Sequence, residues 1–476
     1  MHTSLEAGIA YLVATALFIF GLKKLSKVRT ARRGNQMAAV GMLLAIATTL
    51  LETGNLSWPG LVVGVLLGAA IGGWLSQKVE MTGMPELVAM FNGVGGGASM
   101  LVALSLFWRL YLTSPEASEG LAASEAAGMG GIWAVTVFLS ILIGSITLTG
   151  SLVAMGKLSG KVSGNPILLP NRHLISIALG AGAILVGLLA GFGASGAMAA
   201  TLLILLALIA GALGVLVVIP IGGADMPVVV SLLNSYSGIA ASMAGFVIAN
   251  PLLITAGALV GASGLILTNL MCKAMNRSLA NVLIGGFGGD EVSGDARDYT
   301  NVKSASPEEA AMILESAGSV IFIPGYGMAV AQAQHVVKEM GEELERRGAD
   351  VRYAIHPVAG RMPGHMNVLL AESDVPYEQL FELERINNDF KNTDVAIIVG
   401  ANDVVNPSAI EDPQSPIAGM PILNAHESQT VLMIKRSLSP GYAGIRNPLF
   451  ERDNTLMCFG DGKAFLQETL TELKEA

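Results

Sequence analysis

The sequence predicts a polytopic α-helical membrane domain followed by a soluble, doubly wound α/β domain of the Rossmann-like type. Composition is the first reason, because 52% of the 476 residues are hydrophobic and 14% are charged, against about 45–50% and about 25% in soluble proteins. The charge distribution is the second: residues 1–284 hold 13 Lys or Arg and 8 Asp or Glu, and residues 285–476 hold 15 and 29. The third is an alternation of strand and helix patterns in the second part alone.

The same counts exclude several classes of protein. The net charge of −9 argues against nucleic-acid binding, which needs a basic face, and the composition excludes a wholly soluble or a disordered chain. Cys272 and Cys458 lie one in each part, so they form neither a disulfide framework nor a thiolate zinc site. The six histidines lack the close helical pairing typical of metal ligands, and we predict no metal.

Residues 1–284 contain the predicted membrane helices. A helix needs about 20 mostly apolar residues to cross the hydrocarbon core. We find nine such stretches. The true number could differ by one, because the third stretch is short and the sixth and seventh nearly touch. They are 5–22, 36–51, 58–75, 85–107, 130–151, 173–193, 197–219, 227–249 and 251–271.

The basic residues between these stretches predict the topology. Twelve follow odd-numbered helices, and the loops of opposite parity hold only Arg109. The twelve are Lys23, Lys24, Lys27, Arg29, Arg32, Arg33, Lys78, Lys157, Lys161, Arg172, Lys273 and Arg277. The positive-inside rule then places the N-terminus outside and the C-terminal domain in the cytoplasm. The first helix lacks a leading basic region, so it is not predicted to be a cleavable signal peptide.

Several polar residues lie within or beside the spans, where burial is costly. They are Glu86, Asn92, Ser145, Thr147, Thr149, Ser151, Asp225, Asn234, Ser235, Tyr236 and Ser237. One interpretation is that they line a hydrated path. The other is that the hydroxyls bond to their own helices and Asp225 caps the helix after Pro227. The hydroxyls favour the second interpretation, and Asn92 and Asn234 favour neither. Abundant glycine and alanine predict close helix packing.

The second part is predicted to consist of a linker at 285–307 and a domain at 308–476. The linker is rich in Gly, Asp and Ser without an apolar period, and Ser306-Pro307 then opens a helix as N-cap and first turn. Strands are expected at 319–323, 351–355, 395–399, 431–435 and 456–459, with helices at 328–347 and from 463 to the end. This alternation predicts a parallel sheet.

The first strand leads into Gly325-Tyr326-Gly327-Met328-Ala329-Val330. A GxGxx turn between a strand and a helix is typical of dinucleotide sites, because glycines permit the tight turn and the approach of a pyrophosphate. The pattern alone is weak, since Val stands at the third glycine position, and its context carries the prediction.

The ends of two strands bear on the type of dinucleotide. An NAD site usually has an acidic residue after the second strand, but here that strand ends in Ile355-His356-Pro357. The strand at 431–435 ends in Lys435-Arg436-Ser437, and two cations with a hydroxyl suit a 2′-phosphate. A solvated basic pair is the alternative.

Two further segments follow strand ends, where doubly wound sheets bind ligands. They are 356–365, which contains Arg361, and 400–407, which contains Asp403. Arg361 could bind phosphate or pair with an acid, and Asp403 could cap a helix or titrate beside a nucleotide. Tyr442 lies on a glycine-flanked loop long enough to act as a lid.

Several long motifs closely resemble the β subunit of the proton-translocating NAD(P) transhydrogenase over nearly the whole chain. They are Met84-Pro85-Glu86-Leu87-Val88-Ala89, residues 222–231, Leu233-Asn234-Ser235-Tyr236-Ser237-Gly238, residues 324–334, 356–370 and 400–407, Lys435-Arg436-Ser437 and Gly441-Tyr442-Ala443-Gly444. The resemblance implies hydride transfer between NAD(H) on a partner α subunit and NADP(H) on this chain, of the Re/Si-specific type, coupled to proton translocation.

The resemblance also implies site residues. The NADP(H) site would comprise Gly325, Tyr326, Gly327, Ala329, Val330, His356, Val358, Ala359, Gly360, Arg361, Gly400, Ala401, Asn402, Asp403, Lys435, Arg436, Ser437, Gly441, Tyr442 and Ala443. Asp403 would act beside the nicotinamide. The proton path would include Asn92, Ser151, Asp225, Asn234 and Gly264. Some family members have histidine in place of Asn92, and asparagine cannot relay a proton by titrating. Water or a partner helix would then carry the proton past Asn92.

On family grounds we expect an α subunit with the NAD(H) domain and further membrane helices, a dimer of αβ assemblies, and a bacterial plasma membrane location in the lipid bilayer.

Three rival functions remain. One is a transporter or channel gated by a cytoplasmic NADP(H)-sensing domain, and a need for an NAD(H)-binding partner would discriminate against it. A second is a family member that binds NADP(H) without pumping, which the retained Asp225 and Asn234 disfavour. A dehydrogenase merely anchored in the membrane leaves the nine helices unexplained.

Overall fold

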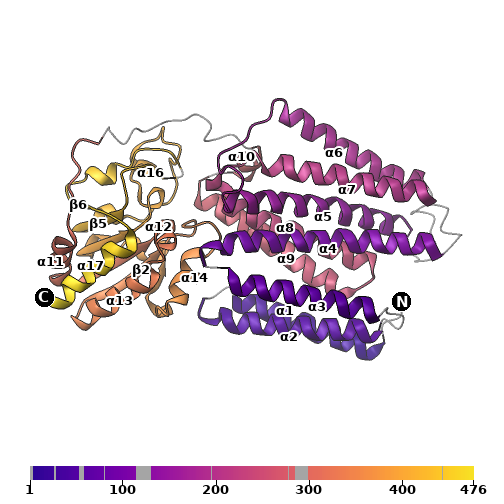
Figure 1. Ribbon diagram of the computed structural model, residues 1–476, viewed down its shortest axis with the longest axis horizontal. Coiled ribbons are helices and arrows are strands. Elements are labelled where there is room, and N and C mark those ends of the chain that lie inside the picture. The colour runs from indigo at the N-terminus through magenta and orange to yellow at the C-terminus, as the bar shows by residue number, and fades with distance from the viewer. Residues whose placement is uncertain are drawn as a thin grey trace. The chain divides into compact units, whose positions relative to one another are not determined.

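The computed structural model describes residues 4–25, 28–52, 58–79, 81–113, 130–194, 196–276, 278–284, 299–441 and 443–476. The chain divides into two compact units (Figure 1). The first is Met1–Ile221 with Val229–Thr268, and the second is Gly222–Val228 with Asn269–Ala476. We describe the helical region and the sheet-containing region separately.

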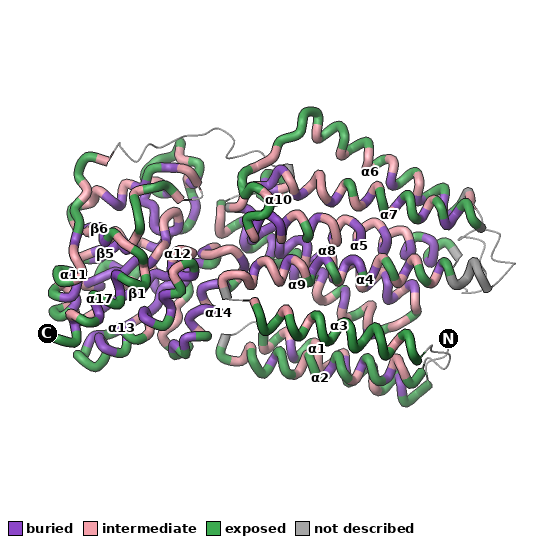
Figure 2. The backbone as a smooth tube through the Cα atoms, in the orientation of Figure 1, coloured by how far each residue is buried: buried purple, intermediate pink, exposed green. Residues whose placement is uncertain are grey.

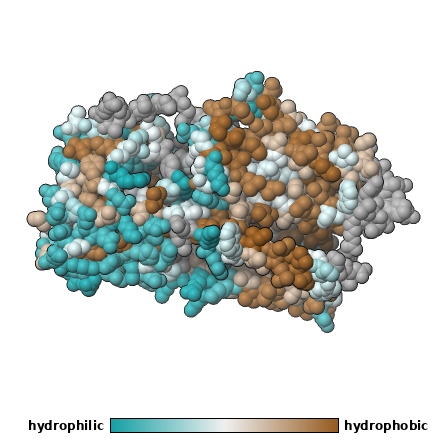
Figure 3. Space-filling model, viewed as in Figure 1, coloured by the Kyte–Doolittle hydropathy of each residue, from teal (hydrophilic) through white to brown (hydrophobic). Residues whose placement is uncertain are grey.

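Among the residues that the structure describes, nine helices are long and apolar enough to cross a membrane, which confirms the predicted membrane domain. They are α1 (Leu5–Leu25), α2 (Val28–Glu52), α3 (Trp58–Lys78), α4 (Met84–Thr113), α5 (Gly130–Leu158), α6 (Arg172–Leu188), α7 (Gly196–Val218), α8 (Met226–Val247) and α9 (Pro251–Ala274). Most run beyond the predicted apolar stretches because the helices continue into polar flanks. Hydrophobic side chains cover the visible face of these helices (Figure 3), as a lipid environment favours.

The helices differ in how far they are buried (Figure 2). The apolar window of α8 is 67% buried, whereas that of α3 is 0% buried. Glycines explain the close packing of α8 on α9. A Cβ atom on Gly238 would lie 2.5 Å from the Gly261 nitrogen, and one on Gly257 would lie 2.5 Å from the Ser242 nitrogen. No larger residue fits these contacts, so glycine sets the distance between the two backbones.

The second region contains a six-stranded parallel sheet in the order β3-β2-β1-β4-β5-β6. The strands are β1 (Ser319–Pro324), β2 (Asp350–Ile355), β3 (Leu380–Glu382), β4 (Val395–Val399), β5 (Thr430–Lys435) and β6 (Thr455–Phe459). The helices of eight or more residues here are α11 (Pro307–Glu315), α13 (Gln334–Arg346), α14 (His365–Glu372) and α17 (Gly462–Glu475). This strand order defines the Rossmann-like class and confirms the predicted fold.

The sheet forms the core of this region. The five residues of β4 are all buried, and β1 and β5 each have a run of at least four buried residues. Ile321, Ile398 and Met433 are at most 1% exposed. Strands that are buried on both faces read as continuous apolar runs, because helices cover the two sides of a parallel sheet. Figure 2 shows these buried strands beneath the more exposed outer helices.

The predicted helix at 328–347 is wrong as a single element. The structure has a short helix, α12 (Tyr326–Val330), and then α13, separated at Gln332, which has a φ of 49°. A left-handed residue ends a helix, yet the apolar period continues through the break. The sequence analysis also missed the three-residue β3 and the helix α14. By contrast, Ser306 forms the predicted N-cap of α11, within a capping box.

Part of the predicted linker contacts the sheet. Residues 285–298 lie outside the described part of the chain, whereas 299–306 are described. Ser304 forms a parallel bridge with Met457 of β6, and the Met457 N–H donates to the Lys303 carbonyl at 2.8 Å. A short helix, α10 (Leu279–Ile284), precedes the undescribed segment. The division at 284 and 307 stays a prediction.

Candidate functional site

The loops after β1 and β4 meet at the carboxyl edge of the sheet. The Gly325 N–H donates to the Val399 carbonyl at 2.9 Å, and the Gly327 N–H donates to the Gly400 carbonyl at 2.9 Å. The strand order reverses between β1 and β4, and doubly wound sheets bind ligands at this switch point. The geometry therefore places the predicted glycine turn where a ligand site is expected.

Three glycines in these loops are required by packing. A Cβ atom on Gly325 or Gly400 would overlap the backbone of the opposite loop, and one on Gly327 would lie 2.6 Å from the Gly400 Cα atom. Gly400 also has a φ of +65°, which favours glycine. These glycines hold the two loops together, a role that does not depend on a ligand.

Arg361 and Tyr326 form a second part of the candidate site. The Arg361 guanidinium carbon lies 4.3 Å from the centre of the Tyr326 ring, within the range of a cation–π contact. The main-chain N–H of Arg361 donates to Nδ1 of His365 at 3.0 Å. Gly360, with a φ of +102°, allows this contact because a Cβ atom there would lie 2.6 Å from His365. The cation thus stands next to the glycine turn.

His356 and His365, at the two ends of the segment 356–365, are buried and neutral near pH 7. His356 is 2% exposed, and its Nε2 atom lies 2.8 Å from the Pro421 carbonyl. The Val358 N–H donates to Nδ1 of the same ring at 3.3 Å. Burial lowers the pKa of His356 to about 4, and burial followed by the charge of Arg361 lowers the pKa of His365 to about 4. His356 therefore holds its loop in place through these two contacts. It does not supply the carboxylate that binds a ribose 2′-hydroxyl in NAD sites.

Asp403 lies against the glycine-flanked loop that contains the predicted lid. Its Oδ2 atom accepts from the Ala443 N–H at 3.0 Å. A Cβ atom on Gly441 would overlap the same carboxylate, so only glycine permits this approach. The sequence left two interpretations of Asp403 open. The structure adds a third role, in which Asp403 anchors this loop. Tyr442 itself lies outside the described residues.

Lys435 ends β5 beside this loop. Its ammonium donates to the Ser439 carbonyl and lies 5.2 Å from the centre of the Phe450 ring. Burial lowers the pKa of Lys435 to about 8, although the negative charge of Asp403 opposes the shift. The lysine is therefore mostly charged at pH 7. Arg436 and Ser437 are exposed. Two adjacent cations and a hydroxyl are available for an anion at this strand end.

The predicted residues thus fall into connected groups. Contacts join Tyr326 to Arg361 and Asp403 to Ala443, and the loops that carry Gly325 and Gly400 join the groups. The donor set fits a phosphorylated dinucleotide, although the site assignments stay predictions. The sequence analysis missed His365 as a support for Arg361 and Asn447 as a partner of Asn402. Long-range contacts set both roles, so no local signal pointed to them.

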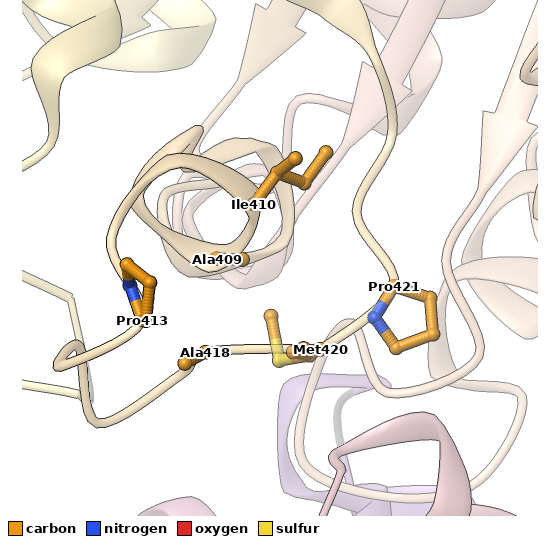
Figure 4. Close-up of a pocket in the computed structure, with 7 residues that line it drawn as sticks. Ala409, Ile410, Pro413, Ala418, Met420 and Pro421 are labelled. Carbon is orange, nitrogen blue, oxygen red and sulfur yellow. The ribbon is translucent and has the colours of Figure 1, made fainter.

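A pocket of about 650 Å³ lies between the segments 409–413 and 418–421 (Figure 4). It is lined by Ala409, Ile410, Pro413, Ala418, Gly419, Met420 and Pro421. None of the described residues that line it is charged, so this lining does not suit a phosphate. Pro421 links its rim to His356 through the hydrogen bond given above.

The candidate proton-path residues contact one another's helices. The Asn92 amide donates to the Val230 carbonyl of α8 at 3.2 Å, and the side chain is buried. Ser151 of α5 lies against Gly93 of α4, and its buried hydroxyl has no hydrogen-bond partner among the described residues. This arrangement brings the segments of Asn92 and Ser151 together.

The remaining candidates lie on or before α8 and on α9. The Gly264 carbonyl accepts from Thr268 at 2.8 Å and from Ser231 at 3.4 Å. Asn234 is half-buried, and Asp225 is 7% exposed in the turn before α8. Thr147 bonds to a carbonyl of its own helix, as the second interpretation of the hydroxyls predicts. Thr149 bonds both to its own helix and to the Gly211 carbonyl of α7, and Ser235 donates to the Gly261 carbonyl of α9, so these two hydroxyls do not follow it.

The helices and the sheet together define a multi-pass membrane protein with a Rossmann-like domain. The family model for the NAD(P) transhydrogenase beta subunit matches residues 7–472. The chain is 50% identical over 462 residues to NAD(P) transhydrogenase subunit beta of Rhodospirillum rubrum, covering 96% of this chain and 97% of that protein. The protein of the same name from a designated strain of that species gives the same figures. The chain belongs to the NAD(P) transhydrogenase beta subunit family.

Proposed function

We propose that this chain is the NADP(H)-binding subunit of a proton-translocating transhydrogenase. Hydride passes between NADP(H) on this chain and NAD(H) on an α subunit, with Re/Si-specific stereochemistry and coupled proton movement. One observation carries the assignment of NADP(H) to this chain. Lys435 is the last residue of β5 and Arg436 follows it, next to the loop of Gly400, whose N–H donates to the Ile434 carbonyl at 3.2 Å. By contrast, β2 ends at Ile355 and is followed by the buried, neutral His356. The site thus offers cations for a 2′-phosphate and no acid for a 2′-hydroxyl.

Each part of the site has a task in this proposal. Lys435, Arg436 and Ser437 bind the 2′-phosphate, and Arg361 beside the Gly325 turn binds the pyrophosphate. The loop at 441–443, anchored by Asp403, covers the site. Hydride transfer between two nicotinamides needs no protein acid or base, so these residues bind, orient and exclude water. Asp403 responds to the charge difference between the oxidised and the reduced nicotinamide.

Proton coupling belongs to the membrane helices. Asn92, Ser151, Asp225, Asn234 and Gly264 lie along the path. The Asn92 amide donates to a main-chain carbonyl and does not titrate, so the proton passes Asn92 on water or on a group from a partner helix. Asp225 is the acid of this set. Its burial supports a functional role, because an acid within membrane helices is costly to keep.

The assembly in this proposal follows the family. An α subunit brings the NAD(H) domain and further membrane helices, and two αβ assemblies form a dimer in the bilayer of a bacterial plasma membrane. The N-terminus lies outside and the soluble domain lies in the cytoplasm, in agreement with the distribution of basic residues.

Calorimetric titration of the purified full-length chain tests the assignment of NADP(H). We expect the chain to bind NADPH at least 100-fold more tightly than NADH. Lys435→Ala should weaken NADPH binding about 10- to 100-fold, because a charged hydrogen bond contributes about 1.5–3 kcal/mol. Lys391→Ala is the matched control, since Lys391 is exposed and precedes the amino end of β4, whereas the site loop follows the carboxyl end of that strand. Equal affinity for NADPH and NADH would contradict the proposal.

A further inference from the structure

We propose that Tyr299 is a positioning residue that couples the NADP(H) site to the segment leading to the membrane helices. The inference rests on the proposed function and specifies the residues that carry its coupling. Tyr299 is the first described residue after 285–298, so any signal that passes along the chain between the site and the membrane helices passes through it. Three sets of contacts, all within the sheet-containing region, support the proposal.

The first set fixes the end of the linker along the edge strand β6. Lys303 and Ser304 pair with Met457, and the Thr300 N–H donates to Oε1 of Glu451 at 2.8 Å. The segment 299–305 therefore belongs to the folded sheet region. If Tyr299 moves at the start of this segment, residues 300–305 stay fixed to the sheet region.

The second set joins Tyr299 to Lys435 through one shared ring. The Tyr299 ring centre lies 5.3 Å from that of Phe450, which is fully buried. The Lys435 ammonium lies 5.2 Å from the centre of the same Phe450 ring. The buried ring cannot shift alone, because cores are close-packed. A movement of Lys435 onto a bound phosphate thus changes the packing against Tyr299.

The third set joins Tyr299 to the loop of Asp403. The Asn447 N–H donates to the Tyr299 hydroxyl oxygen at 2.9 Å. The Asn447 side chain is fully buried, and its amide donates to Oδ1 of Asn402 at 2.8 Å. Asn402 directly precedes Asp403. Asn447 thus connects Tyr299 to Asn402, the neighbour of Asp403, which lies beside the nicotinamide in the proposed function.

The two routes end at the two parts of the site that a change of ligand affects. Lys435 responds to the presence of the 2′-phosphate, and Asp403 responds to the redox state of the nicotinamide. Coupling requires an element whose position both ligand states bias differently. The ring and the hydroxyl of Tyr299 each report one of these events to the linker.

Reconstituted αβ enzyme in sealed vesicles separates coupling from structure. The first assay follows hydride exchange from NADH through bound NADP(H) to an NAD⁺ analogue, at saturating NADP(H). NADP⁺ gains the hydride and NADPH returns it, so the exchange needs no net proton. The second assay follows hydride transfer from NADPH to NAD⁺ together with the pH change inside the vesicles. The coupling ratio is the number of protons moved per hydride.

The variants are Tyr299→Leu, Tyr299→Phe and the control Tyr377→Leu, which changes a partly exposed tyrosine on the 3₁₀ turn before β3. Tyr299→Leu should keep the exchange rate within about twofold and lower the coupling ratio by more than half. Tyr299→Phe keeps the ring and removes the acceptor of the Asn447 N–H, so the coupled rate should fall roughly three- to tenfold. Tyr377→Leu should match the wild type in both assays.

A wild-type coupling ratio in Tyr299→Leu or a wild-type coupled rate in Tyr299→Phe would overturn the inference, as would an equal loss of exchange and coupled rates in either variant. If Tyr299→Leu fails to fold, the Tyr299→Phe result decides. Failure of the proposed function gives a different result, because the wild-type enzyme would then show no exchange through bound NADP(H).

Discussion

The polar groups of the two regions of this chain are satisfied in different ways. At the sheet edge, charged side chains at a strand end or on loops, such as Lys435, Arg361 and Asp403, contact rings or backbone groups. Between the membrane helices, neutral side chains donate to main-chain carbonyls, as Asn92 does to Val230 and Ser235 does to Gly261. In the proposed function, charge recognises a ligand in one region, whereas hydrogen bonds to the backbone join helices in the other.

The buried charged groups of the membrane helices limit where protons can bind. Within the described residues, Lys157 and Asp225 are the buried charged side chains of this part of the chain. The Lys157 ammonium donates to the Asn165 and Ile221 carbonyls at 3.0 and 2.9 Å. The contrast with the charged sheet edge implies that few side chains of the membrane region can carry a proton.

Glycine packing at the sheet edge gives the largest predicted effect. Gly400→Val adds a side chain at a φ of +65° and against the Gly327 backbone, so we expect a loss of several kcal/mol of stability and of NADPH binding. Gly348→Ala is the matched control, because Gly348 also has a positive φ, +96°, but has open space at its Cβ position. It should cost about 1–2 kcal/mol. Thermal unfolding of the detergent-solubilised chain measures both, and equal shifts would contradict the packing role.

A smaller effect is expected in the membrane region. Asn92→Ala removes one interhelical hydrogen bond, and such bonds contribute about 0.6 kcal/mol in membranes. The rate of coupled turnover should fall, but the midpoint of its pH profile should stay in place, because an amide does not titrate. Turnover measured from pH 6 to 9 in vesicles tests this. A shifted midpoint would show that Asn92 sets the pKa of the proton-binding group and would weaken the comparison.

Local patterns in the sequence predicted much of the fold. The nine apolar stretches, the Ser306 cap and the buried strands each follow from residues that are neighbours in the chain. The break at Gln332 was not predictable, because glutamine rarely adopts a left-handed conformation. The three-residue β3 carries too few residues for a periodic signal.

The candidate site was predictable only in part. Strand ends located Gly325, Arg361, Asp403 and Lys435 because doubly wound sheets gather ligands there. The bond from Asn447 to Asn402 joins residues 45 positions apart, and the ring contact of Tyr299 with Phe450 spans a longer separation. Such contacts depend on the folded topology, so no motif announces them.

The pH dependence of NADPH affinity tests the central claim most directly, namely that Lys435 holds the 2′-phosphate. Burial places the pKa of Lys435 at about 8 in the ligand-free chain. The ammonium is charged below this pH and loses its proton above it, so affinity should fall about tenfold between pH 7 and 9.5. The phosphate titrates near pH 6 and is constant over this range.

Calorimetry on the full-length chain and on Lys435→Arg makes the measurement. Arginine stays charged throughout, so the variant should bind NADPH with little change in affinity across the range. A wild-type affinity that does not vary with pH, or an equal fall in the arginine variant, would contradict the account.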